Sequence, residues 1–411
     1  MEEELCRVLA DFVRIMEGYR VDAYRAMASS AISEAANSLY VLGKIRQLTG
    51  LSVTVLSNSE QRFLGYKALA AMEDNFNKII EKGTAILDLD GGSFQISLFD
   101  KDALVTTQNI RMGSLRIRER LAGIQSETEH YEEMVEELIW NEVSSFKKMY
   151  LKDRKIENIM LIGDVFTDSV YQNIEEKTTK IISRENFNTW YEKIIRQSPM
   201  ELAVKLGIPL ENASLMYPSA VIYKCLIDMM GAEHIWIPGV HMTRGIAYEY
   251  AEQMKLLKGG HNFENDILMA AKNIGKRYAV NRPHVQNLEM TALAMFDATK
   301  KMHGMKERER LLLQMAVMLH DVGKYISFNN VADSSYNIIM SNEIIGLSHI
   351  EREMVALIAR YNTVTLPSYD ELVMESSLSA EQYLTVSEQS SVWRMRSTGV
   401  ICRRFRRSAP H

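Results

Sequence analysis

The strongest constraint on the fold is a change of hydrophobic pattern near residue 262. Before it, short apolar runs of strand length alternate with segments whose apolar residues recur every three or four positions. After it, only the helical period remains. This pattern predicts an α/β layer with a largely covered sheet, followed by an all-helical region. Residues 258–262, which include two glycines, are the best linker between them.

The first part divides into two α/β blocks. In the first block, the patterns predict helices over 5–16, 33–48 and 60–72, strands over 51–56 and 85–89, and a hairpin from 94–99 to 103–107. The second block, about 127–255, has a helix over 131–149 and strands over 159–162 and 235–237. The last two dozen residues are rich in arginine and have no clear period, which favours a disordered basic tail.

Charge and cysteine content exclude several classes of protein. The 48 Lys and Arg residues against 53 Asp and Glu residues leave a net charge of −5, which argues against a general nucleic-acid binder. Three widely spaced cysteines argue against a disulfide framework and a zinc ribbon. The N-terminus is acidic, unlike a signal peptide, and the longest apolar run is too short to span a bilayer. We therefore expect a cytoplasmic protein with no nucleic-acid or membrane partner.

The most informative segment reads Ile-Leu-Asp-Leu-Asp-Gly-Gly-Ser at residues 86–93. A strand here delivers the carboxylate of Asp88. Gly91 and Gly92 then let backbone N–H groups approach an anion, and Ser93 adds a hydroxyl donor. A carboxylate beside a phosphate requires a cation between them, so Asp88 is a candidate Mg²⁺ ligand. The alternative, which the motif alone favours, is a hairpin turn in which both glycines only supply positive φ.

Two other segments place polar residues where a strand meets a helix. In residues 25–31, Arg-Ala-Met-Ala-Ser-Ser-Ala, the small residues allow a phosphate to lie on the helix N-terminus, although Ser29 and Ser30 serve equally well as N-caps. In residues 57–62, Ser-Asn-Ser-Glu-Gln-Arg, Glu60 has the chemistry to deprotonate an attacking water. A first-turn glutamate that complements the helix dipole explains Glu60 as well.

The order of these segments, followed by Asn-Ile-Arg-Met-Gly-Ser-Leu-Arg at 109–116, resembles the exopolyphosphatase/guanosine pentaphosphate phosphatase family of the actin-like ATPase superfamily. The resemblance extends to about residue 386 and includes Met-Tyr-Pro-Ser-Ala at 216–220. It implies an α/β protein with two actin-like (ribonuclease H-like) lobes, the first incomplete, and an all-helical HD-like domain. The implied domains are 1–110, 111–257 and 263–386, with the basic tail over 387–411.

The resemblance also implies an activity, the Mg²⁺-dependent hydrolysis of terminal phosphoanhydrides in inorganic polyphosphate or guanosine penta- or tetraphosphate. Glu60 would match the glutamate that activates water, and Asp88 the magnesium carboxylate. The implied phosphate-binding residues are Arg25, Ser29, Ser30, Gly91, Gly92, Ser93 and Gly163. A homodimer is expected by analogy with relatives.

Several departures from the family pattern leave alternatives open. The chain starts after the position of the family's first phosphate loop, Asp-x-Gly-Ser-Asn. Asp90 stands where glycine is usual, while Gln61 and Gln95 replace glutamates. Such changes also fit a truncated, catalytically silent relative or a nucleotide sensor.

The helical region has a resemblance of its own. His284, His320 and Asp321 are similar to the metal ligands of the HD phosphohydrolase superfamily. The usual fourth ligand, a late aspartate, would fall beyond residue 384, where the sequence becomes basic. An HD-type metal-dependent phosphohydrolase is thus a further alternative, against an accessory domain in which His320 and Asp321 are a polar pair. The histidines at 241, 261 and 349 are expected in loops or at the surface.

Overall fold

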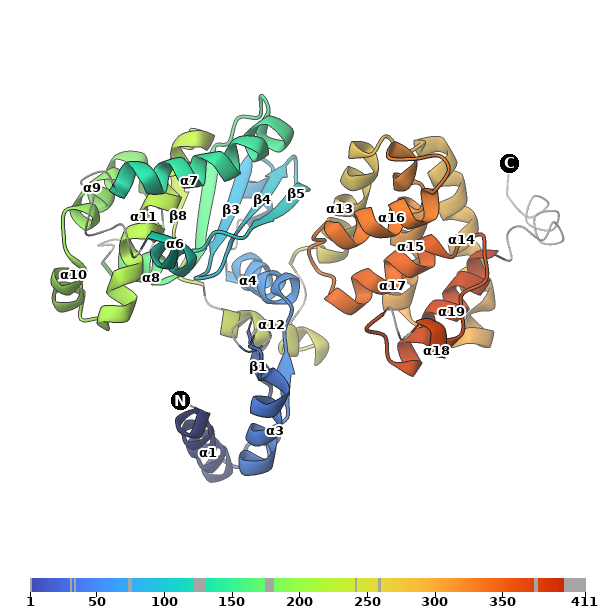
Figure 1. Cartoon of the computed structure of the whole chain (residues 1–411), viewed down its shortest axis with the longest axis horizontal. Helices are drawn as coiled ribbons and strands as arrows, with labels where there is room; N and C mark the ends of the chain where they lie inside the picture. The colour runs from blue at the N-terminus through green and yellow to red at the C-terminus, as the bar shows by residue number, and fades with distance from the viewer. Residues whose placement is uncertain are drawn as a thin grey trace.

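The computed structural model describes residues 2–29, 32, 35–72, 76–121, 131–173, 181–240, 242–257, 260–372 and 376–394. Figure 1 shows two parts, an α/β part built around a mixed sheet and a separate group of helices that begins with α13. The change of pattern near residue 262 therefore marks a domain boundary, as the sequence predicts. None of the helices in these ranges is long and apolar enough to cross a membrane.

The N-terminal elements form a small layer beside the main sheet (Figure 1). They are α1 (Glu2–Gly18), β1 (Ala26–Ala28), α3 (Ser38–Thr49), β2 (Val53–Val55), α4 (Asn58–Met72) and α5 (Phe76–Ile80). Strands β1 and β2 pair in parallel, with Ala26 opposite Val53. Helix α3 ends at Gly50, whose φ of 72° is left-handed, as is usual for a glycine that terminates a helix.

The main sheet has six strands in the order β5-β4-β3-β6-β8-β7. These are β3 (Thr84–Leu89), β4 (Phe94–Asp100), β5 (Ala103–Ile110), β6 (Asn158–Gly163), β7 (Ile181–Ser183) and β8 (His234–Trp236). The hairpin strands are antiparallel, whereas β3 pairs in parallel with β6, Leu87 opposite Leu161. The predicted lobe boundary at 110 is therefore wrong: the hairpin belongs to the second lobe, because β3 pairs with β4 on one edge and with β6 on the other.

Helices cover the main sheet and connect its strands. They are α6 (Ser114–Leu121), α7 (Tyr131–Phe146), α8 (Val165–Asn173), α9 (Arg184–Ile195), α10 (Pro199–Leu206) and α11 (Leu210–Met230), with a π-helical turn at Lys147–Leu151 after α7. Helix α12 (Met242–Gln253) then returns to α4. A Cβ at Gly245 would lie 2.0 Å from the carbonyl oxygen of Leu64, so only glycine permits this close packing. The N-terminal layer thus includes a helix from far along the chain.

The helical domain consists of α13 (Phe263–Arg277), α14 (Arg282–His303), α15 (Glu307–Leu319), a 3₁₀ turn (Val322–Tyr325), α16 (Val331–Ser341), α17 (His349–Arg360), α18 (Tyr369–Leu372) and α19 (Ala380–Arg394). The predicted start of the tail at 387 is wrong, because α19 continues to Arg394. Val392 is 4% exposed and Trp393 is fully buried in the domain core. Residues 395–411 lie outside the described residues.

Candidate active site at the end of strand β3

The loop after β3 is held against the start of α6. The backbone N–H of Asp90 donates to the Ser93 carbonyl (2.9 Å), and that of Ser114 donates to the Asp90 carbonyl (3.3 Å). A Cβ at Gly113 would lie 2.3 Å from the carbonyl oxygens of Asp90 and Gly91, so glycine is required there. The loop conformation is therefore fixed by the helix that follows the hairpin.

Neither Gly91 nor Gly92 has a positive φ, so the alternative in which they only supply that conformation is wrong. A Cβ at Gly91 would lie 3.2 Å from the Cβ of Leu115, which explains Gly91 by packing. A Cβ at Gly92 would have only Arg116 Nη2 within reach, at 4.0 Å. The exposed backbone of Gly92 thus lies beside a guanidinium, an arrangement that suits an anion.

Arg62, which the sequence patterns do not single out, organises this loop from α4. Its side chain is 2% exposed and donates to the Asp88 carbonyl (2.8 Å) and to Ser93 Oγ (2.7 Å). It also pairs with the carboxylates of Asp88 (3.4 Å) and Asp90 (3.6 Å). Gln61 Nε2 donates to Asp90 Oδ2 at 3.1 Å. The extra carboxylate at Asp90 is therefore compensated by protein groups.

Two carboxylates lie at the ends of neighbouring parallel strands. Burial raises the pKa of Asp88 to about 6, although Arg62 opposes the shift. Asp164 follows β6, and burial raises its pKa to about 7 despite hydrogen bonds from the Thr167 N–H (3.2 Å) and Tyr223 Oη (3.4 Å). Asp164 Oδ2 makes no hydrogen bond of standard geometry among the described residues, although the Ser219 hydroxyl lies close enough to lower the pKa of Asp164. A carboxylate oxygen in this position can accept a cation.

Gly163, between these groups, has the backbone that only glycine adopts readily. Its φ is 110°, and a Cβ there would lie 2.4 Å from the Leu89 carbonyl oxygen and 3.0 Å from Asp88 Oδ1. The structure therefore brings Asp88, Gly163 and the loop of Gly91, Gly92 and Ser93 to one edge of the sheet. The sequence patterns did not identify Asp164 as a site residue. Like Asp88, however, it is an aspartate at the C-terminal end of a buried strand.

The raised pKa values predict how stability depends on pH. An aspartate that is exposed to water, as in the unfolded chain, has an ordinary pKa of 3.8, so the folded state binds protons at Asp88 and Asp164 more tightly. Their ionisation therefore lowers the free energy of unfolding as pH rises from about 4 to about 7. We expect Asp164→Asn to be more stable than the wild type at pH 8, on the order of 2 kcal/mol, with little difference at pH 4. Urea denaturation at both pH values measures this, and an equal effect at both would contradict it.

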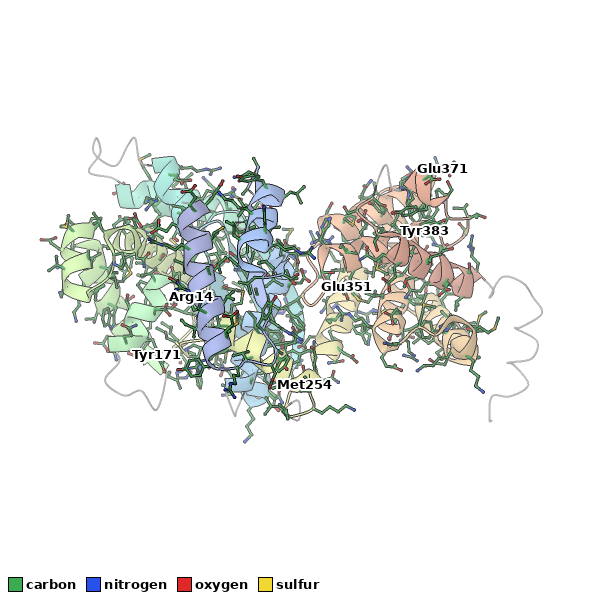
Figure 2. All side chains as sticks on the ribbon, turned by 90° about the horizontal axis from the view of Figure 1, so that it is seen from below. Arg14, Tyr171, Met254, Glu351, Glu371 and Tyr383 are labelled. Atoms are coloured by element: carbon green, nitrogen blue, oxygen red, sulfur yellow. The ribbon has the colours of Figure 1, made fainter. Side chains whose placement is uncertain are left out.

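Glu60 lies on α4 next to Gln61, but its carboxylate does not contact the loop after β3. Its Oε2 accepts from the N–H (2.9 Å) and Oγ (2.7 Å) of Ser57, which is the capping box of α4. It also lines a cavity of about 420 Å³ with Lys67 and Arg308. Arg308 pairs with Glu351 at 2.6 Å, and Glu351 lies on the side of the helical domain that faces the α/β part (Figure 2). A catalytic role for Glu60 stays a prediction.

The predicted N-terminal phosphate ligands lie elsewhere. Arg25 pairs with Glu249 of α12 (3.6 Å), bonds Gln253 and stacks over the ring of Tyr250, so its guanidinium already has partners. Ser29 follows β1, and its carbonyl accepts from Ile32 at 3.0 Å. Ser30 lies outside the described residues. The structure thus gives Arg25 a packing role between β1 and α12.

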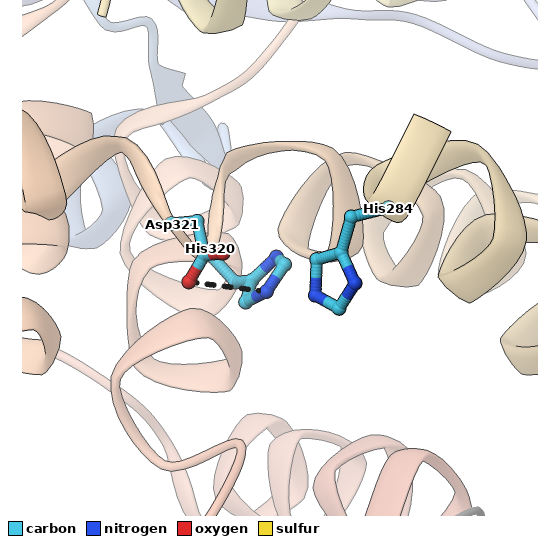
Figure 3. A group of neighbouring side chains, drawn as sticks. All are labelled: His284, His320 and Asp321. Carbon is cyan, nitrogen blue, oxygen red and sulfur yellow. Dashed lines mark ion pairs between the residues drawn. The ribbon is translucent and has the colours of Figure 1, made fainter. Parts of the chain in front are cut away.

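In the helical domain, His284, His320 and Asp321 do converge (Figure 3). One ligand atom from each lies within 4.8 Å of the others. His320 Nδ1 lies 2.8 Å from the Val317 carbonyl and must donate to it, since a carbonyl only accepts. In the neutral ring, Nε2 then points a lone pair at Asp321 Oδ1, 3.3 Å away, which is repulsive unless a proton or a cation intervenes. Lys324, which pairs with Asp321 at 2.6 Å, competes for the same carboxylate.

His261 lies in the linker, as predicted for a loop residue, but its side chain is only 8% exposed. Its Nε2 lies 2.6 Å from Asp266 Oδ2 and 2.8 Å from Tyr66 Oη, and its Nδ1 lies 2.6 Å from Asn77 Oδ1. These partners come from α4, α5 and α13. The loop position is as expected, and the ring joins the N-terminal layer to the helical domain. His241 lies outside the described residues.

Comparison with known proteins gives consistent matches over nearly the whole chain. The model of the Ppx/GppA phosphatase family matches residues 1–254, and that of Ppx/GppA phosphatase domain III matches residues 268–400. A guanosine-5′-triphosphate,3′-diphosphate pyrophosphatase from Photobacterium profundum is 20% identical over 379 residues, which is 91% of this chain and 72% of the relative. A bifunctional 3-dehydroquinate synthase/phosphatase from Fusobacterium nucleatum is 20% identical over 57% of this chain and 36% of its own.

Among solved structures, an exopolyphosphatase from Cytophaga hutchinsonii superposes with a TM-score of 0.53 at 15% identity, covering 61% of this chain and 82% of that one. The Aquifex aeolicus member of the Ppx/GppA family gives a TM-score of 0.50 at 16% identity, covering 62% and 82%. At such low identity these likenesses concern the fold. They confirm the predicted actin-like α/β fold, and the helical C-terminal domain is seen in the structure and matched by the domain III model.

Proposed function

Because this chain belongs to the Ppx/GppA phosphatase family, we propose that it hydrolyses the terminal phosphoanhydride of inorganic polyphosphate or of guanosine penta- or tetraphosphate with Mg²⁺. The observation that carries the proposal is that two partly buried aspartates with raised pKa values, Asp88 and Asp164, lie at the ends of the paired strands β3 and β6, with the Gly91–Gly92 loop directly after β3. Asp88 has a counter-ion in Arg62, whereas Asp164 has none among the described residues; together with the exposed Gly92 backbone and Arg116, these two acids would suit a divalent cation that neutralises phosphate charge.

In this proposal each group has a separate role. Asp88 and Asp164 would hold the cation, which neutralises charge on the phosphate oxygens when bound. The Ser93 hydroxyl, the Gly92 backbone and Arg116 position the terminal phosphate, and Arg62 keeps the loop in place. Glu60 takes the proton of the water that attacks phosphorus, and the leaving group is the shortened phosphate chain or nucleotide. Phosphoryl transfer depends mostly on such positioning and charge neutralisation.

Glu60→Gln tests both the activity and the base. Glutamine can still complete the capping box with Ser57, so the variant is expected to fold like the wild type while losing its basicity. We expect phosphate release from polyphosphate or guanosine pentaphosphate to fall about 100-fold. Malachite-green detection with Mg²⁺ present measures it. Unchanged release would remove Glu60 from the mechanism, and wild-type protein that binds both substrates without turnover would identify a silent relative.

The His284–His320–Asp321 cluster favours a second candidate activity, that of a metal-dependent HD-type phosphohydrolase. The orientation of His320, with Nε2 directed at a carboxylate, is the observation behind it. We expect the protein to bind about one transition-metal ion per chain when loaded with Mn²⁺ or Zn²⁺, and His320→Ala to lose it. Elemental analysis after dialysis measures the metal content. Lys324→Ala removes the partner of Asp321 and is expected to bind the metal ion more tightly. If His320→Ala retained the metal ion, this site would be excluded.

A further inference from the structure

A second charged site lies between the outer strand β5 and helix α13. A cavity of about 550 Å³, which we call the β5–α13 pocket, opens there between the sheet and the helical domain. Its volume is within the range of small-molecule sites, about 300–1,000 Å³. Five cationic side chains line it, Lys148, Lys152, Arg154, Lys276 and Arg277. The pocket is therefore strongly positive in a protein whose net charge is −5.

The positive charge of this pocket is not balanced by protein acids. Glu343 is the one carboxylate among its lining residues, and it also interacts electrostatically with Arg352. The ion pairs found between described residues include none that joins the five cations to a carboxylate. Like charges that converge without counter-ions repel one another, so an anion that enters the pocket gains attraction and relieves this repulsion.

Two of the five cations, Arg154 and Arg277, are also held in place. Tyr150 and Arg277, 127 residues apart in the sequence, are hydrogen-bonded, and the guanidinium lies 5.2 Å from the tyrosine ring centroid. Arg154 donates to the Tyr150 carbonyl at 2.5 Å. Lys148 belongs to the π-helical turn Lys147–Leu151, a feature that is frequent at functional sites. Fixed cations bind an anion with a smaller loss of side-chain entropy than free ones.

This pocket is separate from the site at Asp88. Gln108, the pocket residue nearest the Asp88 end of the hairpin, lies level with Leu87, one residue before Asp88 on β3. Strand β4 lies between β5 and β3, which places these two strands roughly 10 Å apart. Polar neutral groups, Gln108, Asn273 and Asn342, complete the lining. Asn273 and Asn342 each donate one N–H to a backbone carbonyl and keep a second N–H for a ligand oxygen, whereas Gln108 donates both of its N–H groups within β5.

We propose that the β5–α13 pocket binds condensed phosphate as a non-catalytic site. Several adjacent cations with amide donors match a ligand that carries several linked phosphate groups better than a single carboxylate or phosphate. Both an internal segment of a polyphosphate chain and a guanosine tetraphosphate have this chemistry. The proposal concerns binding alone, so it stands or falls independently of turnover at Asp88.

Protection of lysines from acylation tests the pocket directly. The full-length protein is labelled with EDTA and 0.15 M salt, where no metal supports turnover and distant surface charges are screened. The probes are short-chain polyphosphate, guanosine 5′-diphosphate 3′-diphosphate and inorganic phosphate. We expect one or both condensed phosphates to reduce labelling of Lys148, Lys152 and Lys276 at least fivefold at saturation, while the exposed Lys193, Lys205 and Lys301 stay unprotected.

A charge-matched pair of variants gives a second measurement. Lys148→Glu/Lys152→Glu/Lys276→Glu and the control Lys193→Glu/Lys205→Glu/Lys301→Glu change net charge equally at exposed positions. By calorimetry under the same conditions, the first triple variant is expected to lose one class of condensed-phosphate site that the control keeps. The probe that protects the lysines identifies the ligand. Absence of protection by both condensed phosphates, or identical binding by the two triple variants, would overturn the proposal.

Discussion

Replacing Asp88 by Asn is expected to lower the rate of phosphate release about 1,000-fold while the protein stays folded. The carboxylate is the only anionic group that β3 itself presents toward the glycine loop, and it would hold the cation that neutralises the terminal phosphate. An amide keeps the size of the side chain but is a much weaker ligand for Mg²⁺. Burial already disfavours the ionised form of Asp88, so the substitution is not expected to destabilise the fold at pH 8. Initial rates at saturating Mg²⁺ measure the effect.

Asp100→Asn is the matched control, because Asp100 ends β4 at the opposite end of the hairpin. It changes net charge by the same amount and is expected to keep full activity. If Asp88→Asn retained more than a tenth of the wild-type rate, the chemistry would not depend on this end of the sheet. Activity lost in both variants alike would indicate damage to the hairpin rather than loss of a ligand.

The sequence was sufficient to predict the elements that have a clear local pattern. The β3 strand, the hairpin and the α-helical second half follow from the apolar period, and the approach of His284 to His320 and Asp321 follows from the resemblance to the HD phosphohydrolase superfamily. The lobe boundary could not be found in this way. Pairing of β3 with β6 joins segments separated by two helices, and no local pattern distinguishes that pairing from a hairpin that ends its own lobe.

The sequence also contains no indication of which charged groups, distant along the chain, the fold brings together. The β5–α13 pocket joins residues near 150 to residues near 276, each of which resembles an ordinary surface lysine or arginine by itself. Glu60 is the opposite case, because a glutamate three residues after a serine is a local capping signal that the structure realises. Local patterns thus identified elements and caps, while the electrostatic partners depended on tertiary contacts.

Arg62→Met is expected to destabilise the protein by about 3–5 kcal/mol at pH 8, the largest stability effect of any substitution proposed for this chain. The Arg62 side chain is 2% exposed and donates hydrogen bonds to the Asp88 carbonyl and to Ser93 Oγ. It also forms ion pairs with the carboxylates of Asp88 and Asp90. Methionine fills much of the volume but leaves those acids without their counter-ion. Arg62→Lys keeps the charge without the forked geometry and is expected to lose less. Chemical denaturation at pH 8 ranks the three proteins.

The pH dependence of this loss separates charge from packing. Without Arg62 the pKa of Asp88 should rise further above its already raised value, so the cost of ionisation is present at pH 8 and small at pH 4. A loss of packing would be equal at both pH values. The double variant Arg62→Met/Asp88→Asn distinguishes the cost of the charge from a loss of packing at a single pH. If the unpaired Asp88 carboxylate is the cause, removing that carboxylate must restore part of the stability that Arg62→Met loses. Strictly additive effects of the two substitutions would instead show that Arg62 acts through packing alone.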